Sequence, residues 1–191
     1  MTLYHGADAS RPGAVLPSNV QILAAYVGIP GKYGPDTPHI WSGTEWNEYI
    51  SEQPSLRVLP IYTHNFPGDP ANDALDAVDA IKSLGWAAHL EGDQNRILAV
   101  DLEILVDPAY VNPLFNTIKT SGFSPMPYGS DAFVRQNPSG IGYWSALLMS
   151  HAPSVLPPGT RGIQWQWGNT WDLNVFDERV YLGCGRGLRR T

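Results

Sequence analysis

The chain has 191 residues, of which 43% are hydrophobic, so it has enough apolar surface for one folded domain with its own core. Its 18 acidic and 12 basic residues give a formal net charge of -6, which argues against binding to nucleic acid or to anionic membranes. The single cysteine, Cys184, excludes an internal disulfide and a four-thiolate metal site.

The sequence shows no basic segment followed by a long apolar run at its start, and no stretch approaches the ~20 apolar residues of a membrane span. We therefore expect a soluble monomer without a visible signal peptide, and the compartment stays open. Prolines and glycines are spread along the chain rather than gathered in one linker. This predicts one domain over residues 1–183 and a flexible tail over residues 184–191.

Short apolar segments of strand length recur along the chain, several of them bounded by glycine or proline. They cover residues 3–9, 22–27, 56–62, 97–102, 126–129, 140–146, 162–166 and 173–176. Helical periodicity predicts a helix over residues 70–84, capped by Asp69 and ended by Gly85. Weaker patterns predict helices over residues 44–51 and 108–120.

Strands that alternate with helices in the first two thirds of the chain predict a mostly parallel sheet, so the fold class is α/β. Eight strands would close a barrel. The chain is too short for the usual eightfold repeat of strand and helix, which takes roughly 250 residues, unless several helices are missing.

Asp101 and Glu103 follow an apolar run at the end of the fourth predicted strand. Residues two apart on a strand share one face, separated by about 7 Å along the strand. Such spacing suits glycosidic bond cleavage, in which one carboxyl group donates a proton and another acid stabilises positive charge or acts as nucleophile. The alternative is a strand end that faces water, since charged side chains are mostly solvated.

Other polar and aromatic residues fall near the ends of the predicted strands, where barrels of this kind build their active sites. They are Asp8, Tyr62, His64, Tyr128, Trp144, Gln164, Gln166, Trp167, Asp172 and Asn174. Aromatic rings stack on sugar faces, and amides and carboxylates bind hydroxyls, so this mixture predicts a carbohydrate groove. Core packing is the alternative for the tryptophans. Strand alternation predicts that Gln164 and Gln166 share one face, and we expect no metal at His64.

Six short motifs, in order, resemble the landmarks of glycoside hydrolase family 25, the muramidase-type lysozymes, or of closely related glycoside-hydrolase-like domains of unknown function. The motifs cover residues 6–10, 99–103, 128–129, 144–146, 164–167 and 172–176. The resemblance implies a single flattened TIM-like barrel with five strand-helix units followed by three strands that have few helices between them.

The resemblance also implies roles for individual residues. Glu103 would be the general acid/base and Asp101 would assist it, while Asp8 and Asp172 would hold the sugar and tune the acid. Tyr62 and Tyr128 would flank the reacting sugar, with His64, Trp144, Gln164, Gln166, Trp167 and Asn174 as further substrate contacts. The implied partner is a glycan, with peptidoglycan first, and no metal or organic cofactor is implied.

Two segments depart from the family pattern, namely the short turn over residues 168–171 and the long loop over residues 29–41. Both lie where substrate specificity would be set. A second hypothesis is therefore kept beside the hydrolase: a glycan-binding or assembly module that retains the barrel and groove without turnover. For the hydrolase, we expect action at the cell wall after secretion or lysis.

Overall fold

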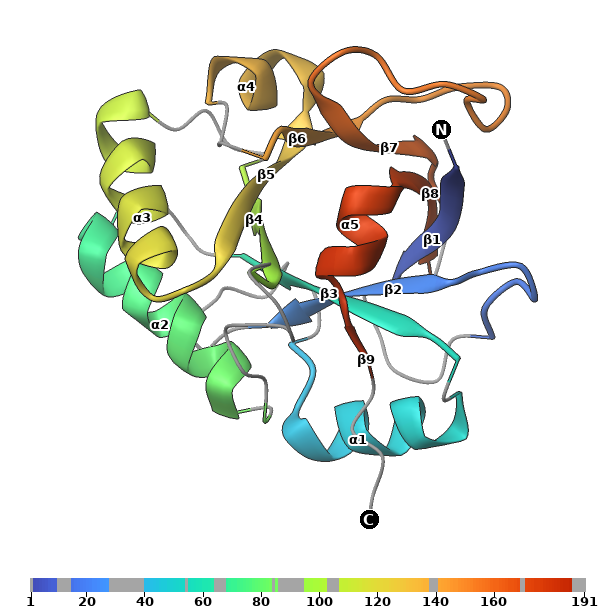
Figure 1. The fold of residues 1–191 in the computed structure, drawn as a ribbon, viewed down its shortest axis with the longest axis horizontal. Coiled ribbons are helices and arrows are strands. Elements are labelled where there is room, and N and C mark those ends of the chain that lie inside the picture. The colour runs from blue at the N-terminus through green and yellow to red at the C-terminus, as the bar shows by residue number, and fades with distance from the viewer. Residues whose placement is uncertain are drawn as a thin grey trace.

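The computed structural model describes residues 2–9, 15–27, 40–53, 55–63, 68–83, 85, 95–102, 107–137, 141–168 and 171–186. Eight strands close into a barrel, and a short ninth strand joins its third strand (Figure 1). The strands are β1 (Leu3–Ala9), β2 (Ile22–Val27), β3 (Arg57–Tyr62), β4 (Ile97–Asp101), β5 (Ser124–Ser130), β6 (Tyr143–Ala146), β7 (Thr160–Gln166), β8 (Trp171–Asp177) and β9 (Gly185–Arg186). All eight predicted strands are confirmed, with bounds that differ by a few residues.

The barrel is mixed in strand direction. From β1 round to β7 each strand is parallel to the next, and β2 pairs with β3 over its whole length. Strand β8 runs antiparallel to both β7 and β1, and its pairing with β1 closes the ring. The amino end of β8 therefore lies beside the carboxyl end of β1.

Helices cover the outside of the barrel along the β2 to β5 segment (Figure 1). They are α1 (Gly43–Glu52), α2 (Pro70–Ser83), α3 (Pro108–Thr120) and α4 (Asp131–Gln136), and α5 (Glu178–Gly183) follows β8. The described part of the chain thus has four strand-helix units rather than the five expected, because residues 15–21, which lead into β2, contain no helix. None of the described helices is long and apolar enough to cross a membrane.

Local capping explains where the helices begin and end. Asp69 Oδ1 accepts hydrogen bonds from the backbone N–H groups of Ala71 and Asn72, at 3.1 and 2.9 Å, which confirms the predicted cap of α2. Gly85 follows α2 with a φ of 81°, a backbone conformation that glycine adopts without strain.

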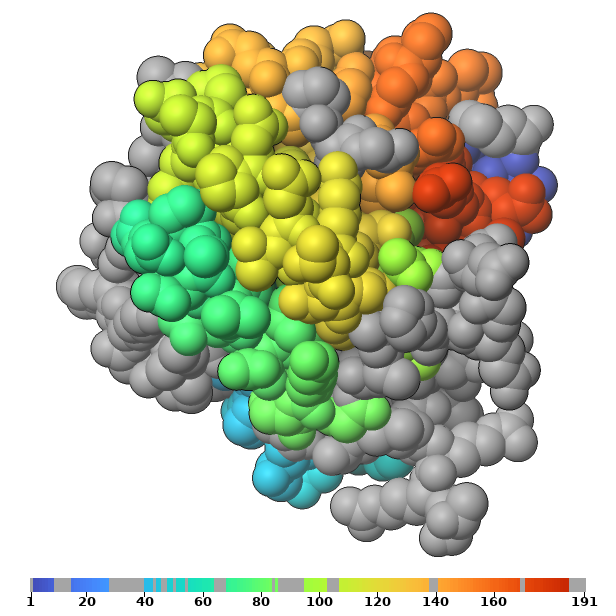
Figure 2. Space-filling model, turned by 60° about the vertical axis from the view of Figure 1, so that its left-hand side comes forward, coloured from blue at the N-terminus to red at the C-terminus, as the bar shows by residue number. Residues whose placement is uncertain are grey.

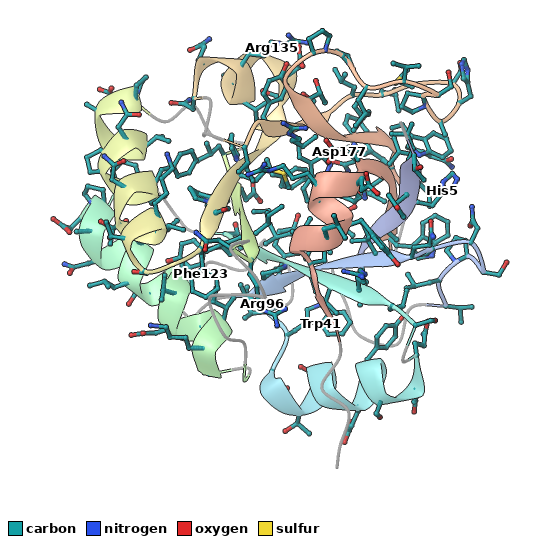
Figure 3. All side chains as sticks on the ribbon, in the orientation of Figure 1. His5, Trp41, Arg96, Phe123, Arg135 and Asp177 are labelled. Atoms are coloured by element: carbon teal, nitrogen blue, oxygen red, sulfur yellow. The ribbon has the colours of Figure 1, made fainter. Side chains whose placement is uncertain are left out.

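Strand alternation divides the apolar side chains between two layers. Leu59 and Ile61 of β3 pack inside the barrel with residues from the other strands, whereas Val58 and Tyr62 pack with side chains from the helices. In that outer layer α2 and α3 lie side by side (Figure 2). Trp41, labelled in Figure 3, meets the ring of Tyr49 on α1 edge to face, with centroids 5.4 Å apart.

Helix α5 fills the amino-terminal end of the barrel and appears within the ring of strands in Figure 1. Val180 and Cys184 are buried in the interior cluster. A Cβ at Gly183 would lie 2.6 Å from Ile97 Cδ1, so a larger residue there would require the Ile97 side chain to move. The predicted boundary at residue 184 is too early, because Cys184 is buried and Gly185–Arg186 pair with the start of β3; residues 187–191 lie outside the described residues.

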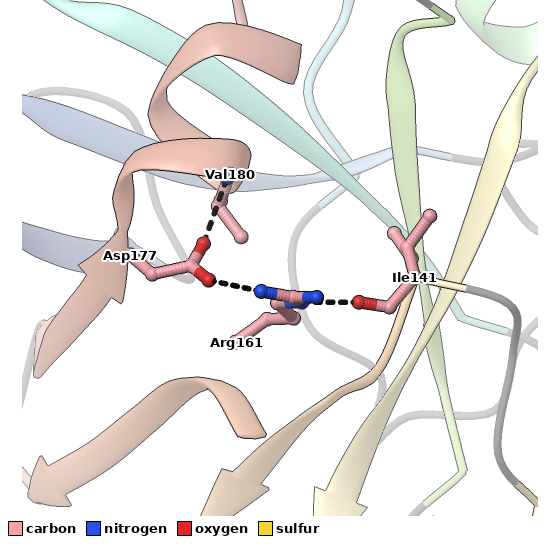
Figure 4. Close-up of polar contacts among 4 residues, drawn as sticks. All are labelled: Ile141, Arg161, Asp177 and Val180. Carbon is pink, nitrogen blue, oxygen red and sulfur yellow. Dashed lines mark hydrogen bonds and ion pairs between the residues drawn. The ribbon is translucent and has the colours of Figure 1, made fainter. Parts of the chain in front are cut away.

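Asp177 holds α5 to the barrel wall, at the point where β8 ends (Figure 3). Its Oδ1 accepts from the backbone N–H of Val180 at 3.1 Å, which caps the helix, and its Oδ2 accepts from Arg161 Nη1 at 2.7 Å (Figure 4). Arg161 Nε also donates to the backbone carbonyl of Ile141. The buried carboxylate thus joins β7, β8 and α5, and Arg161 extends the link to the segment just before β6.

We expect Asp177→Ala to lower the free energy of unfolding by about 2–4 kcal/mol, because it removes both a helix cap and a charge-assisted hydrogen bond. Asp177→Asn keeps the shape but loses the charge, so its loss should be smaller. Urea unfolding of both variants measures the difference. Glu178→Gln at the exposed neighbouring position is the control, and equal losses for Asp177→Ala and this control would contradict the assigned role.

Candidate active site

Two aspartates from neighbouring strands meet at the carboxyl end of β1. The antiparallel register of β1 and β8 places Asp8 directly opposite Asp172. Asp8 is 4% exposed, whereas Asp172 is half-buried at the mouth of the barrel. Directly opposite residues in an antiparallel pair have Cβ atoms about 4.5–5.5 Å apart, so two carboxyl groups share one small space.

A buried amide holds Asp8 from below. Trp144 Nε1 on β6 donates to Asn174 Oδ1 at 3.0 Å, and Asn174 Nδ2 donates to Asp8 Oδ1 at 2.8 Å. Asn174 lies two residues beyond Asp172 on β8, so both side chains face the barrel interior. The strands thereby fix the position of the Asp8 carboxyl group.

Tyr128 and Gln164 connect the two aspartates from the other side. The Tyr128 hydroxyl donates to Gln164 Oε1 at 2.7 Å and lies 3.3 Å from Asp8 Oδ2. Gln164 Nε2 donates to Asp172 Oδ2 at 2.6 Å. The Tyr128 ring stacks on Trp144 with centroids 3.9 Å apart, so the tyrosine is held by packing as well as by its hydroxyl.

Burial and mutual repulsion change the acidity of both aspartates. Burial, with the negative charge of Asp172 beside it, raises the pKa of Asp8 to about 8, although hydrogen bonds from Asn174 and Tyr128 act in the opposite direction. Burial also raises the pKa of Asp172, while the Gly168 N–H and Gln164 counteract the rise. Both shifts favour a proton on the pair.

Asp101 is the third buried acid at this end of the barrel. It ends β4, and the parallel register of β4 and β5 places it beside Tyr128. Ala99, two residues earlier on β4, packs inside the barrel, so alternation turns Asp101 to the interior as well. Glu103 and His64 lie outside the described residues.

Three of the predicted substrate contacts are not in this group. Tyr62 is fully buried in the outer layer, because alternation along β3 turns its neighbour Ile61 inward. A register shift between Gln164 and Gln166 is a β-bulge that pairs Gln166 with Leu173. Gln166 is thus exposed and does not share the face of Gln164, so that expectation is wrong. Trp167 lies beyond the bulge and is 59% exposed.

One contact to Asp172 was not predicted from the sequence. The backbone N–H of Gly168 donates to Asp172 Oδ1 at 2.7 Å. A Cβ at Gly168 would lie 2.1 Å from the carbonyl oxygen of Trp171, so this close approach requires glycine at position 168. The signal was present in the unusually short turn over residues 168–171, which brings a backbone donor to the start of β8.

The structure also has a pocket of about 570 Å³ at the opposite, amino-terminal end of the barrel, beside α5. Arg161, Arg179 and Glu178 line it, and Arg161 is already bound to Asp177. The charges of this pocket nearly cancel, and it lacks coupled acids.

Among the described residues, no group of three or more His, Cys, Asp or Glu side chains is placed to hold a metal ion. We therefore place the candidate site at the carboxyl end.

Two solved structures share this architecture. An uncharacterized B. stearothermophilus protein, solved at 1.07 Å, matches with a TM-score of 0.69 and 18% identity over 95% of this chain and 99% of its own. GHIP, a virulence factor and glycosyl hydrolase 25 of Streptococcus pneumoniae participating in host cell invasion, matches with a TM-score of 0.64 and 11% identity over 92% of this chain and 87% of its own. No protein-family model matches the sequence, and no curated protein matches it either. At these identities the likeness shows the barrel fold alone.

Asp8 should make the stability of the protein depend on pH. Its pKa is raised in the folded protein, so its contribution is fully present below its unfolded value of about 4 and is lost as the pH rises towards 8. Over that range the free energy of unfolding should fall by up to about 1.4 kcal/mol per pH unit on account of this group.

Urea unfolding at a series of pH values measures this slope, and Asp8→Asn should make it shallower because the side chain no longer titrates. Asp79→Asn, at an exposed position on α2, is the matched control and should leave the slope unchanged. Equal slopes for the wild type and Asp8→Asn would show that Asp8 is not the titrating group.

Proposed function

We propose that the protein is a glycoside hydrolase that cleaves an amino-sugar polymer, with peptidoglycan as the first candidate. The observation that carries the proposal is the pair formed by Asp8 and Asp172 at the mouth of the barrel, held by Tyr128 and Gln164. Glycosidic cleavage needs a proton donor and a negative group that stabilises an oxocarbenium-like transition state. Coupled acids whose pKa values are raised by burial are typical of sites that do this chemistry.

Within the proposal, the acids take different roles. Asp172 is the carboxylate that a sugar can reach, because it is half-buried and its two oxygens are already oriented by Gln164 and Gly168. Glu103 is the general acid/base on the basis of its sequence position, two residues after the inward-facing Asp101. The exposed indole of Trp167, next to Gly168, offers a stacking surface for a sugar ring.

The shared barrel of the S. pneumoniae glycosyl hydrolase supports the same class of chemistry without fixing the substrate. The rival function, a glycan-binding module without turnover, requires the groove but no coupled acids. A binding module would gain nothing from two carboxyl groups opposite each other, which is unfavourable while both are ionised.

Replacement of the proposed acids tests the function directly. Glu103→Gln and Asp172→Asn keep side-chain shape but remove the proton donor and the charge, so each should lower kcat by roughly 10²–10⁴-fold. The assay is the release of reducing ends from peptidoglycan and from amino-sugar oligosaccharides. Glu52→Gln, at the exposed end of α1, is the control and should retain full activity.

Undiminished cleavage by both variants would reject the assigned residues. A wild-type protein that binds glycan fragments in calorimetry but releases no reducing ends on long incubation would reject the hydrolase and support the binding module. Activity confined to polysaccharides other than peptidoglycan would keep the reaction class and reject the substrate.

A further inference from the structure

The hydrogen bonds around the Asp8–Asp172 pair form a chain, and Trp144 fixes which group donates at one end of it. An indole N–H can only donate, so the oxygen of the Asn174 amide must face Trp144. The amide nitrogen of Asn174 then faces Asp8 Oδ1 and must donate to it. Oδ1 of Asp8 is therefore an acceptor, and any proton on Asp8 is carried by Oδ2.

Oδ2 of Asp8 faces the hydroxyl of Tyr128, which has a single proton. In one arrangement Asp8 is neutral and donates to Tyr128, Tyr128 donates to Gln164 Oε1, and Gln164 Nε2 donates to Asp172. In the opposite arrangement, with the Gln164 amide turned over, Asp172 is neutral and donates to Gln164, and the hydroxyl of Tyr128 donates to an ionised Asp8. Each arrangement places one proton and one negative charge on the pair.

The two arrangements differ in how well water solvates the negative charge. The charge on Asp172 is half-exposed to water and also accepts the N–H of Gly168 at 2.7 Å, whereas Asp8 is 4% exposed. An ion loses much of its hydration energy on burial, so the charge belongs on the more exposed group. The Tyr128 hydroxyl lies 2.7 Å from Gln164 Oε1 and 3.3 Å from Asp8 Oδ2, so the shorter contact directs its single proton to Gln164.

We propose that Asp8 is a positioning residue that stays neutral in the folded protein, donates its proton to Tyr128, and thereby confines the single negative charge of the pair to Asp172. The ionisable groups around Asp8 favour this assignment. Among the described residues they are Asp172 on β8, Tyr128 on β5, the buried Asp101 on β4 beside Tyr128, and Tyr26 on β2, the strand that pairs with β1 at Asp8. None of them is cationic. The inference deepens the proposed function, yet the proton position itself does not depend on catalysis.

Carboxyl-carbon NMR of protein labelled with ¹³C-aspartate tests the proton position without any substrate. At neutral pH the wild type should show a neutral aspartic acid signal that titrates towards pH 8 and is lost in Asp8→Asn. Asp172→Asn should retain that signal, because Asp8 remains buried. The exposed Asp79→Asn control should lose only its own signal and leave the neutral signal unchanged.

Two results would overturn the assignment. If every aspartate of the wild type is ionised at neutral pH, Asp8 is charged. If the neutral signal disappears in Asp172→Asn, the proton sits on Asp172 in the wild type. Should a variant fail to fold, the wild-type titration still tests the proposal, because a protein without an aspartate that ionises near pH 8 would contradict it.

Activity gives a separate readout that rests on the proposed function. An alkaline loss of kcat near pH 8 in the wild type should vanish in Asp8→Asn, because the neutral asparagine keeps one donor and one acceptor at this position. An alkaline limb that persists unchanged in Asp8→Asn would overturn the positioning role. A protein that shows the NMR behaviour without any turnover would instead reject the hydrolase and leave the proton assignment standing.

Discussion

The antiparallel insertion of β8 between β7 and β1 is the constraint on which the rest of the structure depends. It closes the ring, so each of the eight barrel strands is paired on both sides. The same pairing places Asp8 opposite Asp172, where two ionised carboxylates would repel each other. The barrel therefore cannot close in this register at neutral pH without a proton on the pair or a set of donors around it, and the structure supplies those donors from β5, β7 and β8.

Small residues under the site make the close packing of this region possible. A Cβ at Gly6 or at Gly162 would lie 2.5 Å from the ring of Phe176, so glycine at these two positions leaves the space that the ring occupies. Phe176 in turn packs edge to face on Trp144, whose indole N–H begins the hydrogen-bond chain to Asp8. The interior below the aspartates is thus apolar and filled, which explains why Asp8 is shielded from water on that side. Helix α5 completes this filling at the opposite end of the barrel.

The sequence was sufficient for the elements that follow local rules. Alternation and apolar runs located the eight strands, and Asp69 and Gly85 marked the ends of α2, because caps and positive φ values have local signatures. The convergence of Asp8, Asp172 and Asn174 was also foreseeable, since all three were expected near strand ends of a closed barrel. The placement of β9 was not foreseeable, because two residues carry no periodicity and their position depends on where α5 directs the chain.

The wrong expectations about the site have one physical cause, because the sequence of a single strand does not show which face of the sheet each residue lies on. Gln166 was expected beside Gln164, but one bulge between them reverses the face of every residue that follows. Tyr62 ends β3 on the face that meets the helices, and a strand-end position alone does not decide between the two faces. Neither choice is visible in the strand itself, because each depends on pairing with another segment.

A neutral Asp8 also explains how a charged Asp172 can be kept beside it. If Asp8 were ionised, Tyr128 would turn its hydroxyl to the nearer negative charge and Gln164 would lose its donor. The amide of Gln164 would then be free to turn its oxygen towards Asp172, where two acceptors would face each other. Protonation of Asp8 therefore sets the orientation of Tyr128 and Gln164, and through them the charge on Asp172. The charge that a ligand meets at the mouth of the barrel is thus controlled by Asp8, which the ligand does not touch.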